Sequence, residues 1–235
     1  MIDLVGFDGD DTLWRSQEFY DHAQEAFEAI LGRYIDLGTD GLRDALLATE
    51  RGNIALFGYG AKGMALSMIE SAIELTNGRI EARDIHRIVK LGKEVLRHPV
   101  ELLPGIREAV EAVAAAHEVV LITKGDLFHQ EAKVARCGLT DVFHRIEIVS
   151  EKDAATYNRL FREFEVTPDR FAMVGNSLKS DIAPVVALGG WGVYMPYHST
   201  WAHEIVDDFG ASDRVIEVSG ADAIPNAIEK MHRTT

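Results

Sequence analysis

The sequence predicts an α/β fold in which a doubly wound parallel sheet carries a small all-helical unit inserted after its first strand. Within residues 99–235, short and continuously apolar runs alternate with helical segments, as in parallel sheets covered by helices on both faces. Residues 16–98 contain helical patterns and no convincing strand signal. We therefore divide the chain into a sheet-containing core of residues 1–15 and 99–235 and a helical insert of residues 16–98.

The first strand is the apolar run at residues 2–7, which ends at Asp8-Gly9-Asp10-Asp11. In the insert, apolar residues recur at helical spacing from Phe19 to Tyr34, and Ser16 is a suitable N-cap. Glycine-containing breakers divide the rest of the insert, and Pro99 closes it. The helices expected between these breakers cover residues 40–57, 62–76 and 82–97.

After Pro99, strands and helices alternate to the end of the chain. Pro104 is placed to open a helix that reaches Ala116, and Gly138 is placed to end the next one. The expected strands cover residues 118–122, 145–149, 171–174, 191–195 and 214–218. The expected helices between them cover residues 127–136, 153–164 and 179–188, and a last helix ends the chain. Right-handed crossovers would make this a doubly wound sheet.

The composition limits the classes of partner. A hydrophobic content of 47% is ordinary for a soluble globular protein. The net charge of −14 argues against non-specific nucleic-acid binding, but a local cation or metal could still attract a phosphorylated substrate. The single Cys137 cannot form an internal disulfide, and neither a signal peptide nor a membrane span is recognisable. We expect a cytoplasmic protein without nucleic-acid or membrane partners.

Polar side chains follow the predicted strands, and ligands of open α/β sheets bind outside the carboxyl ends of the strands. The residues after the first four strands include, in strand order, Asp8, Asp10, Asp11 and Thr12; Thr123, Lys124 and Gly125; Lys152; and Asn176, Ser177 and Asp181. We therefore expect acids, a hydroxyl group and a lysine to converge at one edge of the sheet.

This set of residues suits phosphoryl transfer. A carboxylate such as Asp8 can attack phosphorus, provided that a metal ion and Lys152 offset the repulsion between the two anions. Asp10 could protonate the leaving oxygen and then activate water. Mg²⁺ prefers oxygen ligands, which Asp8, the backbone carbonyl of Asp10 and Asp181 could supply. Thr123 and backbone N–H groups of the glycine-containing turns would hold the phosphate oxygens.

The same residues resemble the four motifs of the haloacid dehalogenase superfamily, in the family's order and over essentially the whole chain. Phe7-Asp8-Gly9-Asp10-Asp11-Thr12-Leu13 is similar to the first motif, Asp-x-Asp-x-Thr after an apolar strand. Leu121-Ile122-Thr123 resembles the second motif, Lys152 matches the third, and Met173 to Asp181 matches the fourth.

The resemblance implies a Rossmann-like core and a magnesium-dependent hydrolase. It implies Asp8 as the nucleophile, Asp10 as the acid and base, and Thr123 and Lys152 as phosphate-binding groups. The helical insert resembles the family's alpha-helical cap, which closes over the site and selects substrates, so we expect two units that move relative to each other. The predicted function is hydrolysis of a small-molecule phosphomonoester through an aspartyl phosphate.

The fourth motif departs from the family pattern, because many members carry an acid where this chain has Asn176. An asparagine can present an oxygen to Mg²⁺ or to a metal-bound water, but it brings no charge. Asp181 is then the expected acidic ligand. Asp11 is expected to serve the turn, and Thr12 to orient the loop. The backbone N–H of Lys124 is well placed for phosphate, whereas its side chain could equally face solvent.

Two loops allow two interpretations each. Residues 58–63 could read the substrate through Tyr59 and Lys62, or form an ordinary interhelical turn. After the fifth strand, Tyr197, His198 and Trp201 are expected in a packed loop rather than at the mouth of the cleft.

Other functions stay open at this point. A 2-haloacid dehalogenase needs neither Mg²⁺ nor a second acid in the first motif, whereas Asp10 is present here. A phosphonate hydrolase would want an imine-forming lysine, for which Lys62 is the formal candidate, and a phosphomutase keeps both aspartates. A non-catalytic binding protein would have lost a chemical residue, and only Asn176 hints at that. Sugar phosphates, nucleotides, phosphoglycolate and other small organic phosphates all fit the predicted chemistry.

Overall fold

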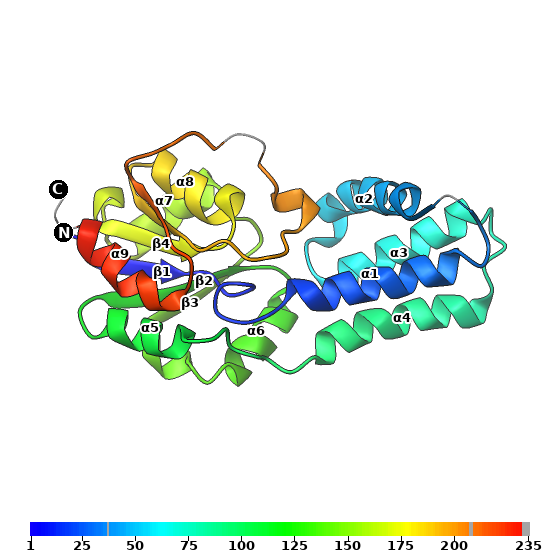
Figure 1. The fold of residues 1–235 in the computed structure, drawn as a ribbon, viewed down its shortest axis with the longest axis horizontal. Coiled ribbons are helices and arrows are strands. Elements are labelled where there is room, and N and C mark those ends of the chain that lie inside the picture. The colour runs from blue at the N-terminus through cyan, green and yellow to red at the C-terminus, as the bar shows by residue number, and fades with distance from the viewer. Residues whose placement is uncertain (37, 207–208, 232–235) are drawn as a thin grey trace. The chain divides into compact units, whose positions relative to one another are not determined.

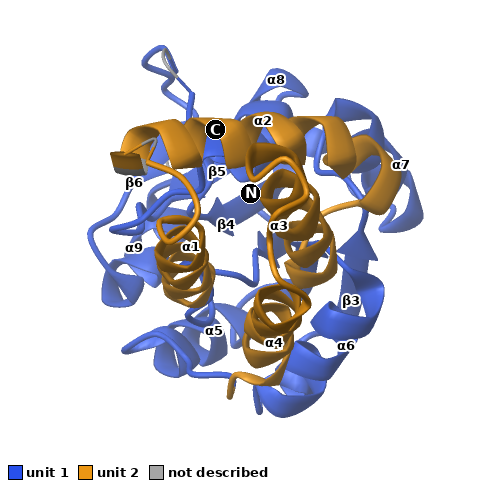
Figure 2. Ribbon diagram, turned by 90° about the vertical axis from the view of Figure 1, so that its right-hand side faces the viewer, with its two compact units in different colours: residues 1–17, 100–235 blue, residues 18–99 orange. Residues whose placement is uncertain are grey.

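The computed structural model describes residues 1–36, 38–206 and 209–231, and its chain divides into two compact units. The first unit comprises residues 1–17 and 100–235, and the second comprises residues 18–99 (Figure 2). The sequence placed these boundaries one or two residues earlier. Among the described residues, the first unit encloses two buried apolar clusters and the second unit encloses one.

A six-stranded parallel sheet forms the centre of the first unit (Figure 1). Its strands are β1 (Leu4–Phe7), β2 (Glu118–Lys124), β3 (Arg145–Val149), β4 (Phe171–Gly175), β5 (Trp191–Tyr194) and β6 (Val215–Glu217). They lie in the order β3-β2-β1-β4-β5-β6, and every neighbouring pair is parallel. The chain runs outward from β1 in both directions, which places the topological switch point beside β1. The predicted doubly wound α/β fold is confirmed.

Helices cover both faces of the sheet (Figure 1). They are α5 (Ile106–Ala114), α6 (Leu127–Arg136), α7 (Ala154–Glu163), α8 (Ala183–Ala187) and α9 (Ile224–Met231). Because successive strand residues face opposite sides, Val5 and Phe7 of β1 belong to the buried cluster that includes α5 and α9. Leu4 belongs to the cluster on the other face, with α7 and α8.

One predicted helix differs from the observed structure. Residues 179–188 were expected as a regular helix, but residues Leu178–Ile182 form a π-helix before α8 begins at Ala183. The N–H of Ile182 reaches back five residues to the carbonyl of Ser177, at 3.2 Å. Single π-turns of this kind occur frequently at functional sites.

Short 3-10 helices complete the described part of this unit. They are η1 (Thr140–Val142), η2 (Pro168–Arg170), η4 (Ala202–Glu204) and η5 (Ala221–Ala223), and the π-helix keeps the label η3.

The second unit is helical in its described residues. It contains α1 (Gln17–Leu31, which begins one residue before the unit), α2 (Gly38–Phe57), α3 (Ala61–Leu75) and α4 (Ala82–Arg97). Phe27, Leu31, Met68 and Ile88 are fully buried in its core. The glycines and Asn77 of the two predicted breakers have positive φ angles, which explains why the helices end there. Among the described residues, no helix combines the length and hydropathy that a membrane span requires.

Candidate active site

The loop after β1 begins the site. The N–H of Asp8 donates to the carbonyl of Val174 at 2.9 Å, so the ladder between β1 and β4 continues to this residue. At Gly9, an added Cβ would lie 2.7 Å from the Trp14 ring and 3.0 Å from the Thr123 hydroxyl oxygen. Glycine therefore lets the loop approach the end of β2 closely.

Asp11 serves the turn, as predicted. Its φ of 60° lies in the left-handed region, which aspartate tolerates better than most residues. Its carboxylate accepts the N–H groups of Ser16 at 2.8 Å and Gln17 at 3.0 Å, at the start of α1. Burial and the nearby Asp10 raise the pKa of Asp11 to about 7, against the effect of these two hydrogen bonds.

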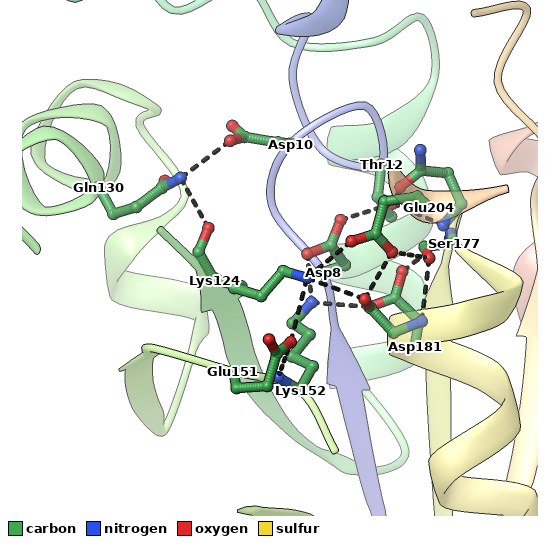
Figure 3. Close-up of polar contacts among 12 residues, drawn as sticks. Asp8, Asp10, Thr12, Lys124, Gln130, Glu151, Lys152, Ser177, Asp181 and Glu204 are labelled. Atoms are coloured by element: carbon green, nitrogen blue, oxygen red, sulfur yellow. Dashed lines mark hydrogen bonds and ion pairs between the residues drawn. The ribbon is translucent and has the colours of Figure 1, made fainter. Parts of the chain in front are cut away.

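A buried lysine joins carboxylates from two strand ends. Lys152, which follows β3, donates its ammonium to Asp8 and to Asp181 Oδ1, the latter at 2.7 Å (Figure 3). All three side chains are buried. Asp181 Oδ2 accepts the N–H of Ser177 at 3.0 Å, and a Cβ at Gly175 would lie only 2.2 Å from that oxygen. The π-turn and Gly175 therefore fix the Asp181 carboxylate against the end of β4.

One ammonium shared by two carboxylates leaves the group short of positive charge. Burial, followed by the charge of Asp181, raises the pKa of Asp8 to about 7, although Lys152 acts in the opposite direction. Burial opposes the charged form of Lys152, but Asp181 and Asp8 outweigh it and raise the pKa of the lysine. A carboxylate with a raised pKa beside a buried cation is typical of functional sites.

Thr12 orients the loop through its hydroxyl group. Its Oγ1 lies 3.1 Å from Asp8 Oδ2 and 3.2 Å from Asn176 Oδ1, and it accepts the N–H of Asn176 at 3.0 Å. Asp8 Oδ2 and Asn176 Oδ1 therefore both approach a single hydroxyl group.

These oxygens suit a hard cation. Asp8 Oδ2 and Asn176 Oδ1, which both lie near the Thr12 hydroxyl, are oxygen donors of the kind that Mg²⁺ prefers, and the backbone carbonyl of Asp10 is the further donor expected from the sequence. Both oxygens of Asp181 are instead engaged, by Lys152 and by the N–H of Ser177. Among the described residues, no group of three or more His, Cys, Asp or Glu side chains could by itself hold a metal.

The side chain of Asp10 points away from Asp8 and toward α6 (Figure 3). Its carboxylate accepts hydrogen bonds from Lys133 Nζ at 2.7 Å, Gln130 Nε2 at 2.8 Å and the Trp14 indole at 2.5 Å. Burial alone would raise the pKa of Asp10, but the charge of Lys133 and these three hydrogen bonds outweigh it, so the pKa is lowered. Sequence reasoning missed this set of donors.

Thr123 and Lys124 end β2 with different environments. The Thr123 hydroxyl is buried and has no hydrogen-bond partner within the described part of the chain. The ammonium of Lys124 donates to Glu204 at 2.7 Å, Ser180 at 3.0 Å and Glu151 at 3.2 Å. The side chain is only 12% exposed, so the interpretation that it faces solvent is wrong. Glu204, on η4, is another residue of the site that sequence reasoning missed.

The remaining candidates belong to the helical unit and to the connection between β5 and β6. Tyr59 and Lys62 belong to the turn between α2 and α3 and to the first turn of α3, in the helical unit. Between β5 and β6, the rings of Tyr197 and His198 lie 4.2 Å apart, and those of Trp201 and His203 lie 4.3 Å apart.

Comparison with known proteins places this geometry in a family. The haloacid dehalogenase-like hydrolase family matches residues 2–189. A haloacid dehalogenase-like family hydrolase from Xanthomonas campestris is 54% identical, with 99% of this chain and 93% of that chain covered and a TM-score of 0.89. No curated protein matches the sequence.

Two more distant structures share the fold. A 2-haloacid dehalogenase from Pseudomonas syringae is 20% identical over 98% of this chain and 99% of that chain, with a TM-score of 0.63. A magnesium-bound HAD hydrolase from Bacillus subtilis is 16% identical over 97% and 98%, also with a TM-score of 0.63.

Proposed function

Because this chain belongs to the haloacid dehalogenase-like hydrolases, we propose that it is a magnesium-dependent phosphatase of small phosphomonoesters. The observation that carries the proposal is the buried, unpartnered hydroxyl of Thr123. It lies against Gly9, the residue that follows Asp8, and no described residue accepts its proton. A buried polar group without a partner is costly, and a phosphate oxygen would satisfy it.

In the proposed reaction, a carboxylate oxygen of Asp8 attacks phosphorus, the bond to the leaving oxygen breaks, and Asp8 becomes phosphorylated. Lys152 already contacts Asp8, and its ammonium would offset charge on the transferred phosphoryl group. Water then attacks the phosphorus atom of the phosphorylated aspartate, which regenerates Asp8 and releases inorganic phosphate.

Asp10 is proposed to give a proton to the leaving oxygen and later to accept one from the attacking water. Its three hydrogen-bond donors hold it as a carboxylate, which suits the second of these roles. The first role requires its side chain to rotate away from Lys133 and to carry a proton, because the ion pair with Lys133 lowers its pKa.

Mg²⁺ would be held by Asp8, the carbonyl of Asp10 and Asn176, with Asp181 placed next to Lys152. When bound, it supplies positive charge that favours the ionised form of Asp8 and reduces repulsion of the phosphate. The magnesium named in the Bacillus subtilis relative is consistent with this choice of metal.

The test is hydrolysis of 4-nitrophenyl phosphate by the purified protein, with MgCl₂ or with EDTA. We expect metal-dependent turnover that falls by about three orders of magnitude or more in Asp8→Asn. The matched control is Asp141→Asn, the same chemical change at an exposed position on η1, which should keep the wild-type rate. Unchanged turnover in Asp8→Asn would place the chemistry elsewhere.

A second assay distinguishes the proposed phosphatase from the main alternative, a 2-haloacid dehalogenase. A dehalogenase would release chloride from 2-chloropropionate in EDTA and would not need Asp10 as an acid. We include this substrate because a 2-haloacid dehalogenase from Pseudomonas syringae shares the fold. Chloride release without metal, together with no phosphate release, would replace the phosphatase by a dehalogenase.

A further inference from the structure

Glu204 brings an additional carboxylate to the strand ends from a part of the chain that carries no recognised motif. It lies on η4, within the long connection between β5 and β6. Connections of this length are uncommon and are often functional. The Glu204 side chain is 14% exposed, and each of its oxygens has a partner in the core unit.

The two oxygens of Glu204 bind different groups. Oε1 accepts from the Lys124 ammonium at 2.7 Å, and Oε2 accepts from the hydroxyls of Ser177 and Ser180, both at 2.5 Å. Lys124 also donates to Ser180, at 3.0 Å, so Lys124, Ser180 and Glu204 form a closed ring of contacts. Burial works against ionisation of Glu204, but Lys124 and both serines outweigh it, and its pKa is lowered.

The ring joins the two sides of the proposed phosphate site. Lys124 follows Thr123, whose hydroxyl has no partner among the described residues, and Ser180 precedes Asp181, which accepts a hydrogen bond from Lys152. A second tie fixes η4 to the same turn, because Lys179 donates to the carbonyl of His203 at 2.5 Å. Glu204 is therefore connected both to the end of β2 and to the π-turn after β4.

We propose that Glu204 is a positioning residue for phosphate binding, which acts by fixing the Lys124 ammonium against Ser180 and the turn that carries Asp181. The proposal rests on the phosphatase function proposed above. Two other roles would give different results. If the Glu204 carboxylate only repelled phosphate, its presence in the wild type would weaken phosphate binding. If it bound the metal, its presence would strengthen Mg²⁺ binding.

The sign of one measurement separates these roles. Glu204→Gln keeps the size of the side chain and removes its negative charge. If repulsion dominated, inorganic phosphate would bind more tightly to the variant. If positioning dominates, phosphate binds more weakly, because the ammonium loses the nearer of its two carboxylate partners and keeps only Glu151, at 3.2 Å, and the Ser180 hydroxyl.

The experiment is calorimetric titration of inorganic phosphate in MgCl₂, with a separate titration of Mg²⁺ alone. We expect Glu204→Gln to weaken phosphate binding about tenfold and to leave Mg²⁺ affinity within about twofold. For 4-nitrophenyl phosphate, KM should rise while kcat changes little. Glu204→Asp keeps the charge and should give an intermediate loss. The control is Glu217→Gln, an exposed glutamate on β6, which should bind phosphate as the wild type does.

A double-variant cycle tests whether Glu204 acts through Lys124. In a protein that already carries Lys124→Met, Glu204→Gln should weaken phosphate binding by no more than about a further twofold. Tighter or unchanged phosphate binding in Glu204→Gln overturns the proposal, as does a full additional loss on the Lys124→Met background. Weaker Mg²⁺ binding with unchanged phosphate binding would instead make Glu204 a metal ligand.

These titrations do not depend on turnover. If the wild type fails to hydrolyse 4-nitrophenyl phosphate, the phosphatase function fails, and the phosphate titrations still decide the role of Glu204. Circular dichroism of each variant identifies any that has lost its fold, and Glu204→Asp then carries the test.

Discussion

Each of the two units contains a cluster of ionised side chains around a buried carboxylate, and the two clusters differ in how their charges balance. In the core unit, the carboxylates of Asp8 and Asp181 share the ammonium of Lys152. In the helical unit, Arg33 at 2.6 Å and Arg87 at 3.3 Å both pair with the one carboxylate of Asp84. The first cluster lacks positive charge and the second has a surplus.

The shifts in pKa follow this difference. Burial and Asp181 raise the pKa of Asp8 to about 7, whereas hydrogen bonds from Tyr34, at 2.5 Å, and from Arg33 lower the pKa of Asp84. A carboxylate with surplus donors is stable as it stands and has no need of a ligand. A carboxylate that shares its only cation is stabilised when a further positive charge arrives, which is what a catalytic site requires. Charge balance therefore distinguishes the two clusters, and it favours the core cluster as the one that would accept a further positive charge.

The largest effect is expected from a substitution that removes the cation of the core cluster. Lys152→Met leaves two buried carboxylates without their cation, and we expect the free energy of unfolding to fall by about 3–5 kcal/mol and phosphatase turnover to disappear. Urea denaturation measures the first effect. Lys93→Met, at an exposed lysine on α4, is the control and should change stability by less than about 0.5 kcal/mol. Adding Asp181→Asn should restore part of the loss, and a double variant that is less stable still would contradict the charge argument.

The second prediction addresses the packing of the helical unit. Met68 on α3 is fully buried, so Met68→Ala should lower the stability of this unit by about 3 kcal/mol. Hydrogen exchange should accelerate for amides of α3 and α4 and remain unchanged for those of β1 and β4. Leu66→Ala, on the same helix but 45% exposed, is the control. Equal acceleration in the sheet would show that the two units unfold as one.

The third prediction uses the lowered pKa of Asp84. Because the pKa in the folded state lies below the ordinary value of 3.8, the stabilisation is complete above that value and is lost as the pH falls through the folded pKa. Thermal unfolding of the helical unit should therefore become easier below about pH 4 in the wild type. Asp84→Asn should be less stable at neutral pH and should have lost this part of the pH dependence. An unchanged acid limb would show that other carboxylates cause it.

The smallest effect concerns substrate selection. Lys62 is exposed on α3, so Lys62→Ala should leave stability within about 0.5 kcal/mol. If the helical unit selects substrates, KM for the preferred phosphorylated metabolite should rise a few-fold while kcat and hydrolysis of 4-nitrophenyl phosphate stay the same. Tyr59→Phe, which removes only a hydroxyl group, gives the matched comparison at the neighbouring turn. If both variants have the KM of the wild type, residues 58–63 form an ordinary interhelical turn that does not bind the substrate.

The sheet could be predicted from the sequence because each strand is short, apolar and bounded by breakers. The strand ends then indicated Asp8, Thr123, Lys152 and Asp181, since parallel strands bring their carboxyl ends to one edge. The contacts of Lys152 with Asp8 and Asp181 agree with that reasoning.

The missed residues lie where strand-end reasoning does not reach. Glu204 comes from a connection without periodicity, so only the folded structure brings it to Lys124. Gln130 and Lys133 did leave a signal, because two polar residues three apart lie on the buried face of α6. The π-turn before α8 was not predictable from a helical pattern, since hydrophobic spacing does not distinguish it from a regular turn.

The hydrogen bond from Trp14 to Asp10 makes Trp14 an intrinsic fluorescent probe of the Asp10 carboxylate. The indole is fully buried, and its N–H donates to the carboxylate that is proposed to move protons. Indole emission is sensitive to a negative charge at that nitrogen, so rotation or protonation of Asp10 would change the fluorescence without any attached dye. A stopped-flow trace of Trp14, with Trp191 and Trp201 replaced by phenylalanine, would then follow the acid–base residue during a single turnover.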